Sequence, residues 1–416
     1  MLKSTRAALF AGALCIAGQP AFAETLTLEQ AVAKAVEAAP LMKANDAAIA
    51  AARAGKMQAG VRPNPSVTVE AENFVGSGPY NVLGRAEITG MYSQPIERGG
   101  KRDARVAYAE RNIGVAQASA LVTRLDIAAA VERAFIDIMI ADAVVKITTY
   151  RLETEQGIER EALRRVRGYK DPLFVETRAA ARVAQAQIDV EQAKAKASAA
   201  RNNLASFWSG SGADLEVAGE FLPYMPFALK LAKADLSLAE AEAARASAAV
   251  TVEQSRVVQD YTVSGGARFL RGTNDVALVA GITIPLGRFD RNQGNIERAQ
   301  AERLRADLMA EANRLERLRR LASLRADADA SRTRADAIMA EVYPRTTKTL
   351  AQVREGYNRG GFTFRDVQDA ADAILAVQDQ WLIAMTQYRD LQTEIDRLTG
   401  RFDDADAGSE VGEIRP

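Results

Sequence analysis

The chain has 416 residues, with 54 basic and 54 acidic side chains, no histidine and one cysteine. The absence of histidine removes the commonest general base and the commonest transition-metal ligand. The balanced charge provides no basic surplus of the kind that binds nucleic acid. We find no catalytic, cofactor-binding or metal-binding motif, so the sequence indicates neither an enzyme nor a nucleic-acid partner.

Residues 1–23 are organised like a secretory signal peptide. A short basic region precedes the apolar residues 7–17, and residues 21–23 form a small-x-small cleavage site. Such a segment is removed on export, and we expect cleavage before Glu24. The residues around Cys15 fit lipoprotein processing poorly, so we expect this cysteine to leave with the signal peptide. The mature chain would then have no disulfide and no thiol.

After the signal peptide, segments with helical periodicity alternate with segments in which apolar and polar residues alternate. The first pattern is typical of helices and the second of strands. The first part of the chain is therefore predicted to form, in order, helix 26–60 with a break at Pro40, β-hairpin 66–94, long helix 98–168, a turn at 168–172 and return helix 173–208.

The second part of the chain repeats this order after a Gly- and Pro-rich linker. A constant offset of 190 residues carries Pro95 onto Pro285 and Arg98 onto Arg288. We therefore predict two repeats of one unit. The predicted segments are the first repeat 24–210, linker 211–227 and the second repeat 228–400, which contains helix 228–258, β-hairpin 261–284, long helix 288–357, a turn at 358–361 and return helix 362–398, followed by a disordered tail at 401–416.

The lengths of the predicted helices indicate how they pack. In each repeat the two short helices together are about as long as the long helix, which would span on the order of 105 Å at about 1.5 Å per residue. A helix of that length is typical of a coiled coil or a helical barrel. The simplest packing stacks two short helices end to end beside each long helix. The result is four helical columns with four strands at one end.

Four strands are too few to close a sheet, and an open sheet leaves two unpaired edges. Alternating strands of about ten residues are long enough to cross an outer membrane, where only a closed barrel satisfies the backbone. Closure then requires several chains. Three protomers would give twelve strands and twelve helical columns around a channel. Two soluble hairpins that cap a helical bundle are the alternative.

Two motifs before the long helices carry a resemblance to a known family. Residues 94–102 are Gln-Pro-Ile-Glu-Arg-Gly-Gly-Lys-Arg, and residues 284–296 contain Ile-Pro-Leu and then Phe-Asp-Arg-Asn-Gln-Gly-Asn-Ile. The chain resembles a TolC-type outer-membrane efflux protein over nearly its whole mature length, and the motifs are similar to the branch for heavy-metal cations of the cobalt–zinc–cadmium type. The resemblance implies a mainly α-helical, internally duplicated protomer of a trimeric 12-stranded outer-membrane β-barrel, continued by a long periplasmic α-helical barrel.

The same resemblance implies a passive export duct that needs no cofactor. Its partners would be two further copies of itself, a periplasmic adaptor (membrane fusion protein), an inner-membrane RND-type pump and outer-membrane lipid, and its cargo would be heavy-metal cations. Because a duct need not bind what it passes, the residues themselves leave the cargo open between metal ions and drugs or other small molecules. A periplasmic coiled-coil structural or adaptor protein without a membrane barrel is the alternative function.

The return helix of the second repeat contains the candidate pore constriction. Asp366 and Asp369 lie on one helical face, and Asp366-Val367-Gln368-Asp369 matches the Asp-Val-x-Asp stretch with which TolC-like proteins ring their periplasmic constriction. In a trimer, six such carboxylates around one axis would favour cations. Their proximity should raise the pKa of some of them. A solvated helix face is the alternative.

The resemblance also implies a closed state held by contacts among a tyrosine, an arginine and an aspartate near this constriction. Tyr357 matches the tyrosine position. The chain has Phe362 where the family has the arginine, and Arg359 or Arg365 would have to take the role of that arginine.

Overall fold

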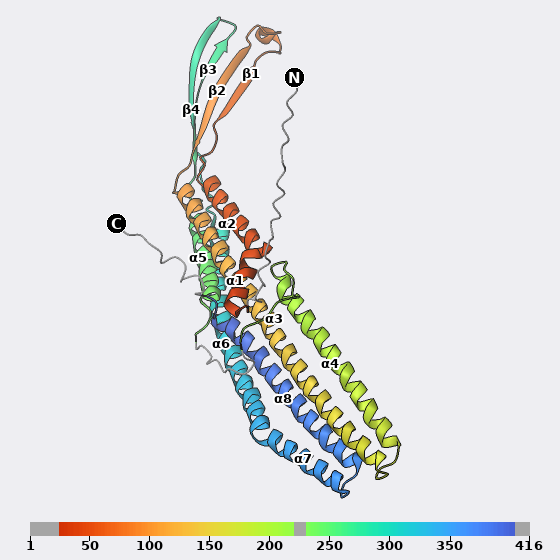
Figure 1. Ribbon diagram of the computed structural model, residues 1–416. Helices are drawn as coiled ribbons and strands as arrows, with labels where there is room; N and C mark the ends of the chain where they lie inside the picture. The colour runs from red at the N-terminus through yellow and green to blue at the C-terminus, as the bar shows by residue number, and fades with distance from the viewer. Residues whose placement is uncertain (1–24, 220–229, 404–416) are drawn as a thin grey trace, which may run out of the picture.

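The computed structural model describes residues 25–219 and 230–403. The molecule is elongated, with the strands at one end and a helical bundle that extends to the other (Figure 1). In the described part of the chain, no helix is both long enough and apolar enough to span a membrane. The predicted signal peptide with Cys15, residues 220–229 of the linker region and residues 404–416 of the predicted tail lie outside the described residues.

The first repeat follows the predicted order of elements. Pro40 is the first residue of α2 and separates it from α1, because proline lacks the N–H that would continue the preceding helix. Strand β1 has seven residues and ends just before Asn73, which has a positive φ. The elements are α1 (Leu28–Ala38), α2 (Pro40–Ala59), β1 (Ser66–Glu72), the short 3-10 helix η1 (Gly78–Tyr80), β2 (Glu87–Ile96), α3 (Lys101–Arg167) and α4 (Phe174–Ser206).

The second repeat differs from the first in its long helix. The predicted helix 288–357 begins only at Gln293. It also contains a π-helical turn, because Pro344 has no N–H to donate and its ring crowds the preceding turn. The equivalent long helix of the first repeat, α3, has no such interruption. The elements are α5 (Lys233–Ser255), β3 (Tyr261–Leu270), β4 (Asp275–Thr283), α6 (Gln293–Ala337), the π turn η2 (Ile338–Val342), α7 (Tyr343–Arg359) and α8 (Phe364–Thr399).

The four strands form one antiparallel sheet in the order β1-β2-β3-β4. The central pair β2–β3 joins the two repeats, and Gly266 is required there because a Cβ atom would lie 2.0 Å from the carbonyl oxygen of Gly90. Strands β1 and β4 each have one edge that no described strand pairs with. Among the described residues the sheet is therefore open.

The strand register separates apolar from polar side chains. Since Val67 pairs with Tyr92, and Tyr92 with Gly265, residues in register share one face of the sheet. One face carries mostly apolar residues, among them Val67, Val69, Ile88, Tyr92, Val263, Phe269, Val276, Leu278 and Ile282. The opposite face carries polar and charged residues, among them Thr68, Glu70, Glu72, Glu87, Thr89, Ser264 and Arg268.

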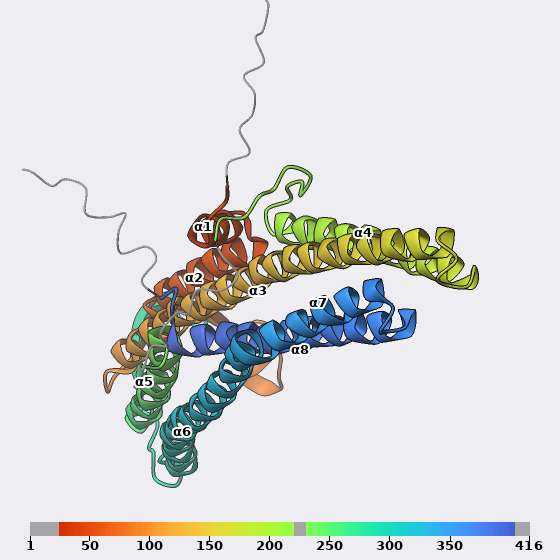
Figure 2. The ribbon, with the colours of Figure 1, turned by 60° about the horizontal axis from the view of Figure 1, so that its bottom comes forward.

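The turns that follow α3 and α7 lie at the same end of the molecule, far from the strands (Figure 1). We call this end the tip. Helix α4 lies along α3 and α8 along α7, so the tip consists of two antiparallel helix pairs (Figure 2). The apolar cluster there draws residues from both pairs, including Ile158, Val175, Leu350, Val367 and Ile374.

Helices α8 and α5 meet end to end, as the predicted stacking requires. The Ala232 N–H donates to the Leu398 carbonyl at 2.8 Å, and the Lys233 N–H donates to an Asp403 carboxylate oxygen at 2.6 Å. Asp235 places a negative charge in the first turn of α5, and Arg397 places a positive charge in the last turn of α8. Each charge is favourable to its helix dipole, and the two side chains bind each other at 2.7 Å.

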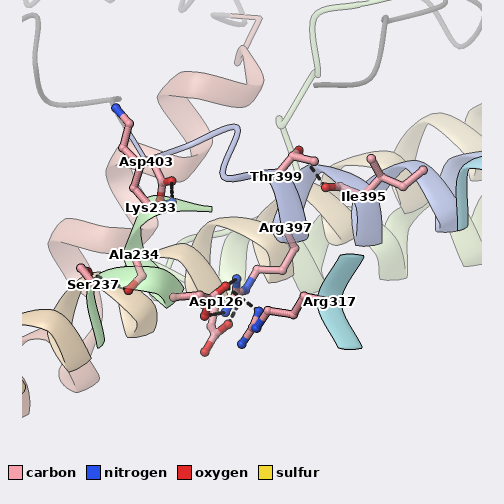
Figure 3. Close-up of polar contacts among 10 residues, drawn as sticks. Asp126, Lys233, Ala234, Ser237, Arg317, Ile395, Arg397, Thr399 and Asp403 are labelled. Atoms are coloured by element: carbon pink, nitrogen blue, oxygen red, sulfur yellow. Dashed lines mark hydrogen bonds and ion pairs between the residues drawn. The ribbon is translucent and has the colours of Figure 1, made fainter. Parts of the chain in front are cut away.

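Two further groups complete this contact. Arg317 of α6 binds Asp235 at 2.7 Å, and Asp126 of α3 binds Arg397 at 2.6 Å. Figure 3 shows Arg317 and Arg397 converging beside Asp126. We call Asp126, Asp235, Arg317 and Arg397 the joint, because they tie α3, α5, α6 and α8 together.

The described residues of the predicted linker and tail pack against the rest of the chain. In the described part of the linker, the Leu26 N–H donates to the Glu216 carbonyl at 2.8 Å, and this contact fixes the segment against the start of the chain. The prediction of disorder from residue 401 is wrong for residues 401–403. Phe402 is buried in the core cluster that α1, α3 and the start of α5 share, and Arg401 binds Glu132 at 2.9 Å and Asp396 at 3.1 Å.

Candidate functional site

The first candidate residue, Asp366, has a structural role within its own helix. Thr363 is the N-cap of α8, and its N–H and hydroxyl both donate to one Asp366 carboxylate oxygen at 2.7 Å. The Asp366 N–H donates in turn to the Thr363 hydroxyl at 3.3 Å, which completes a capping box. The backbone hydrogen bond from Thr363, and then its hydroxyl, hold the pKa of Asp366 below its ordinary value.

The second candidate residue, Asp369, is free to face solvent. Its side chain is 69% exposed and lies 3.9 Å from Arg365, whose side chain is 81% exposed. Exposed ion pairs of this kind contribute little to stability. Asp369 therefore keeps its charge accessible one turn beyond Asp366 on the same face of α8.

Tyr357 forms a contact between the two repeats at the tip. The side chain is fully buried, and its hydroxyl donates to Asp171, in the turn after α3. Arg165 binds Asp171 through two nitrogens at 2.9 and 3.0 Å, and its guanidinium lies 4.3 Å from the centroid of the Tyr357 ring. We call Arg165, Asp171 and Tyr357 the tip contact.

The groups of the tip contact stabilise the charged form of Asp171 and the neutral form of Tyr357. The Arg165 guanidinium, more than the Tyr357 hydroxyl, lowers the pKa of Asp171. Burial, followed by the hydrogen bond to Asp171, raises the pKa of Tyr357. Over the whole range around neutral pH, Asp171 is therefore charged and Tyr357 is a neutral donor.

The arginine of this contact is neither of the two that the sequence suggested. Arg359 is paired with Glu355, and Arg365 lies near Asp369. Arg165 and Asp171 were missed because they belong to the other repeat. The signal that could have found them is the turn after each predicted long helix, because columns of equal height with the strands at one end place both turns at the other end.

Phe362, which stands where the resemblance implies an arginine, packs locally. A Cβ atom on Gly356 would lie 2.2 Å from its ring, so the aromatic side chain covers the last turn of α7. Phe362 thus packs on α7 itself, and the arginine beside Tyr357 comes from α3.

Further ion pairs connect the two helix pairs. Arg182 of α4 binds Asp372 of α8 and also Glu155 of α3, and Arg354 of α7 binds Glu161 of α3. Asp372, the next acidic residue after Asp369, is thus engaged within the chain. Among residues 25–219 and 230–403, no cluster of histidine, cysteine, aspartate or glutamate could hold a metal ion. The described residues of the tip thus combine exposed carboxylates with ion pairs that connect its helices.

Comparison with known proteins identifies relatives over the whole body of the chain. The sequence profile of the family described as outer membrane efflux protein matches residues 31–210 and 228–401. The chain is 32% identical over 386 residues to the cobalt-zinc-cadmium resistance protein CzcC of Cupriavidus metallidurans. The aligned region covers 90% of each chain. It is 29% identical over 312 residues to the nickel-cobalt-cadmium resistance protein NccC of Alcaligenes xylosoxydans xylosoxydans, with 70% of this chain and 67% of the relative covered.

A solved structure has the same fold. The outer membrane protein VceC of Vibrio cholerae matches with a TM-score of 0.70 at 18% identity, over 89% of this chain and 95% of that one. The predicted resemblance and the duplicated, mainly helical fold are confirmed. The family consists of channels of efflux systems, in which such channels work with an adaptor and a pump, and it is not a family of enzymes. With both of its repeats matched, the chain belongs to the outer membrane efflux protein family.

Proposed function

We propose that this outer-membrane efflux channel exports heavy-metal cations, handed on by an inner-membrane RND-type pump and a periplasmic adaptor. The observation that carries the proposal is the 32% identity to a cobalt-zinc-cadmium resistance protein over 90% of both chains. The nickel-cobalt-cadmium and the nickel and cobalt resistance proteins among its relatives support the same class of cargo.

The channel is a homotrimer in this proposal, with β4 of one protomer paired to β1 of the next. Both strands have one edge that no strand of the described residues pairs with, and closure removes these edges. The apolar face of the sheet would meet lipid and the polar face would line the lumen, which is the arrangement of outer-membrane barrels. The helices continue this barrel as a periplasmic duct.

Asp366 and Asp369 form the periplasmic constriction in this proposal. Three copies would bring six carboxylates near one axis and favour cations over anions. Asp369 supports this role through its exposure. Like-charge proximity in the trimer would act against the hydrogen bonds from Thr363 that lower the pKa of Asp366 in the single chain.

The tip contact is the proposed closed-state lock. It holds α7 of the second repeat against the turn between α3 and α4 of the first repeat. Arg165 provides the positive charge that Phe362 cannot, while Arg359 and Arg365 remain exposed beside the entrance.

Loss of the gene tests the cargo. A strain that lacks it but keeps the pump and adaptor should become sensitive to cobalt, zinc or cadmium ions, and the intact gene should restore growth. Greater sensitivity to drugs with unchanged metal resistance would contradict the cation proposal and favour a different cargo.

The double variant Asp366→Ala/Asp369→Ala tests the constriction in planar bilayers. We expect a smaller preference for cations and weaker block by multivalent cations, with the trimer retained. Asp379→Ala is the matched control, because Asp379 is also an exposed carboxylate on α8 but lies further from the tip. If the double variant and the control both behaved like the unmodified channel, the two aspartates would be ordinary surface charges.

A further inference from the structure

The charged residues of the sheet are confined to one end of one face. The strand register places no charged residue on the apolar face of the four described strands. On the polar face, the rows of residues nearest the helices are uncharged and include Ser66, Ser93 and Ser264. The two rows farthest from the helices contain all the charges of this face (Figure 1). We call their five charged residues the mouth: Glu70, Glu72, Glu87, Arg268 and Asp275.

Arg268 is the one basic residue of the mouth, and three neighbouring side chains hold it. Its Nη1 lies 2.9 Å from a carboxylate oxygen of Glu87, and its Nη2 lies 3.2 Å from one of Glu72. Its Nε–H donates to the Thr89 hydroxyl at 2.9 Å, and Thr89 is only 2% exposed. Because these partners belong to β1 and β2, the guanidinium of this β3 residue is fixed across three strands.

The mouth keeps an excess of negative charge. Arg268 brings one positive charge to the two carboxylates that it binds, while Glu70 and Asp275 are exposed. The side chains of Glu72 and Arg268 are 49% and 34% exposed, so solvent reaches these charges as well. Two further arginines, at positions 85 and 271, lie in the loops beyond the strands and not on this face.

The mouth has a distinct place in the proposed barrel. The polar face would line the lumen, so the mouth would lie where the duct ends, on the side away from the periplasmic helices. Carboxylates that line a pore favour cations, but conduction also requires that the bound ion can leave. A mouth with carboxylates alone would retain multivalent cations at the point where they must be released.

We infer that Arg268 sets the cation preference at the outer mouth of the duct. It limits the attraction of the four carboxylates, so that cations enter the mouth and still leave it. The inference rests on the trimeric channel proposed above. It concerns a different region from the proposed constriction, because Asp366 and Asp369 belong to α8, which begins at the tip (Figure 1).

Arg268→Gln in planar bilayers tests this role. The long helical part stays on the side to which the protein is added, so the mouth opens to the opposite compartment. We expect the ratio of cation to anion permeability, measured from the reversal potential, to rise by at least about twofold. Cobalt(II) ions added to the opposite compartment should block the variant more strongly. Both effects should shrink at high salt, since the Debye length falls from about 10 Å at 0.1 M to about 3 Å at 1 M.

Further variants separate the charge of Arg268 from its role in strand pairing. Arg268→Lys keeps the charge and should keep the permeability ratio. Glu72→Gln/Glu87→Gln breaks the same ion pairs but should lower the ratio. Arg98→Gln is the matched control, because the Arg98 guanidinium lies 5.1 Å from the centroid of the Tyr261 ring, at the other end of β3. This control should change neither the ratio nor the block from the opposite compartment.

A thiol at position 277 tests the same row while Arg268 and its contacts remain. Ala277 is in register with Arg268, and the only natural cysteine, Cys15, lies within the predicted signal peptide. A positively charged thiol reagent on Ala277→Cys should lower the permeability ratio, and a negatively charged one should raise it. Neither reagent should have an effect on Ala280→Cys, which lies on the apolar face.

The outcomes separate this inference from the proposed function. Conducting channels in which Arg268→Gln leaves the permeability ratio and the cobalt block unchanged would overturn the inference, and Arg268 would then be only a cross-strand ion pair. If Arg268→Gln forms no channel, the two reagents on Ala277→Cys decide, and equal effects of both would overturn it. Absence of any conductance from the unmodified protein would contradict the proposed function itself.

Discussion

The joint and the tip both connect the two repeats through arginine and carboxylate groups, but they differ in burial. At the joint, the Asp235 side chain is 5% exposed and binds two arginines. At the tip, the ion pairs within one helix are exposed, such as Arg359 with Glu355 at 77% and 61%. The contacts between helices are more buried there, namely the tip contact around Tyr357 and the pair of Arg182 with Glu155.

This difference assigns different mechanical roles to two regions with similar chemistry. Breaking a buried ion pair is costly because it leaves a charge without compensation, whereas exposed pairs contribute little. The joint therefore fixes four helices relative to one another. At the tip, the arginines that connect the helices are about one-third exposed in two pairs, so we expect these pairs to contribute less than those of the joint.

The largest effect should come from a buried acid that extends the joint region. Glu132 is 1% exposed, with Arg401 and Asp396 against it and Arg389 nearby. Burial, and then the charge of Asp396, raise the pKa of Glu132 to about 9, although the nearby arginines oppose this. Above pH 4.5 the unfolded chain releases this proton while the folded chain keeps it, so the contribution to stability is present at low pH and is lost as pH rises towards 9.

Glu132→Gln should remove this dependence on pH. The free energy of unfolding of the unmodified protein should fall between pH 5 and pH 8, with a limiting slope of about 1.4 kcal/mol per pH unit for one proton. The melting temperature should fall with it, and both should fall less in the variant. Glu29→Gln is the control, since Glu29 lies 3.8 Å from the same Arg401 but its side chain is 70% exposed. An unchanged pH dependence in Glu132→Gln would show that Glu132 is ionised in the folded chain.

Asp235→Ala should have the next largest effect. It removes the shared partner of Arg317 and Arg397, and we expect a loss of about 3 kcal/mol in the free energy of unfolding. Thermal melting of the purified protein measures this loss. In the first repeat, Asp142→Ala breaks a pair with Arg201 in which the acid is 34% exposed, and should cost less than about 1 kcal/mol. Equal losses in the two variants would contradict the special role of the joint.

Tyr357→Phe should have a moderate and local effect. The ring remains, but Asp171 loses the hydroxyl donor, at a cost of about 1–2 kcal/mol. Hydrogen exchange should accelerate in residues 165–171 and stay unchanged at the joint. Tyr169→Phe is the control, because Tyr169 lies in the same turn and is 98% exposed. Faster exchange throughout α3 would mean that the tip contact supports the whole helix and not the tip alone.

Local patterns were sufficient to predict the architecture, because the signals are periodic. The alternation in strands and the 190-residue offset from Pro95 to Pro285 need no tertiary information. The π turn could have been anticipated from Pro344, which lies within the predicted long helix. The order of residues 401–403 depends on burial of Phe402 against distant helices, which no local pattern contains.

The candidate site was predicted less completely for the same reason. Asp366 and Asp369 form a local motif, and their place at the start of α8 follows from the turn. The partners of Tyr357 are 186 and 192 residues away in sequence. A hydrogen bond from a helix of one repeat to a turn of the other leaves no mark in either segment. Only the position of both segments at the tip reveals it.

The smallest effect is expected for Arg359→Ala. This variant tests whether Arg359 or Arg165 is the arginine of the proposed closed state. Arg359 pairs with Glu355 on its own helix and is 77% exposed, so its removal should change the free energy of unfolding by less than about 0.5 kcal/mol. It should leave hydrogen exchange at the tip unchanged, since Arg165 still holds Asp171 and Tyr357. Arg165→Ala, measured beside it, should accelerate exchange there. If Arg359→Ala loosened the tip as much as Arg165→Ala, exposed and buried arginines would contribute alike, and burial would not be what distinguishes the tip contact from its surroundings.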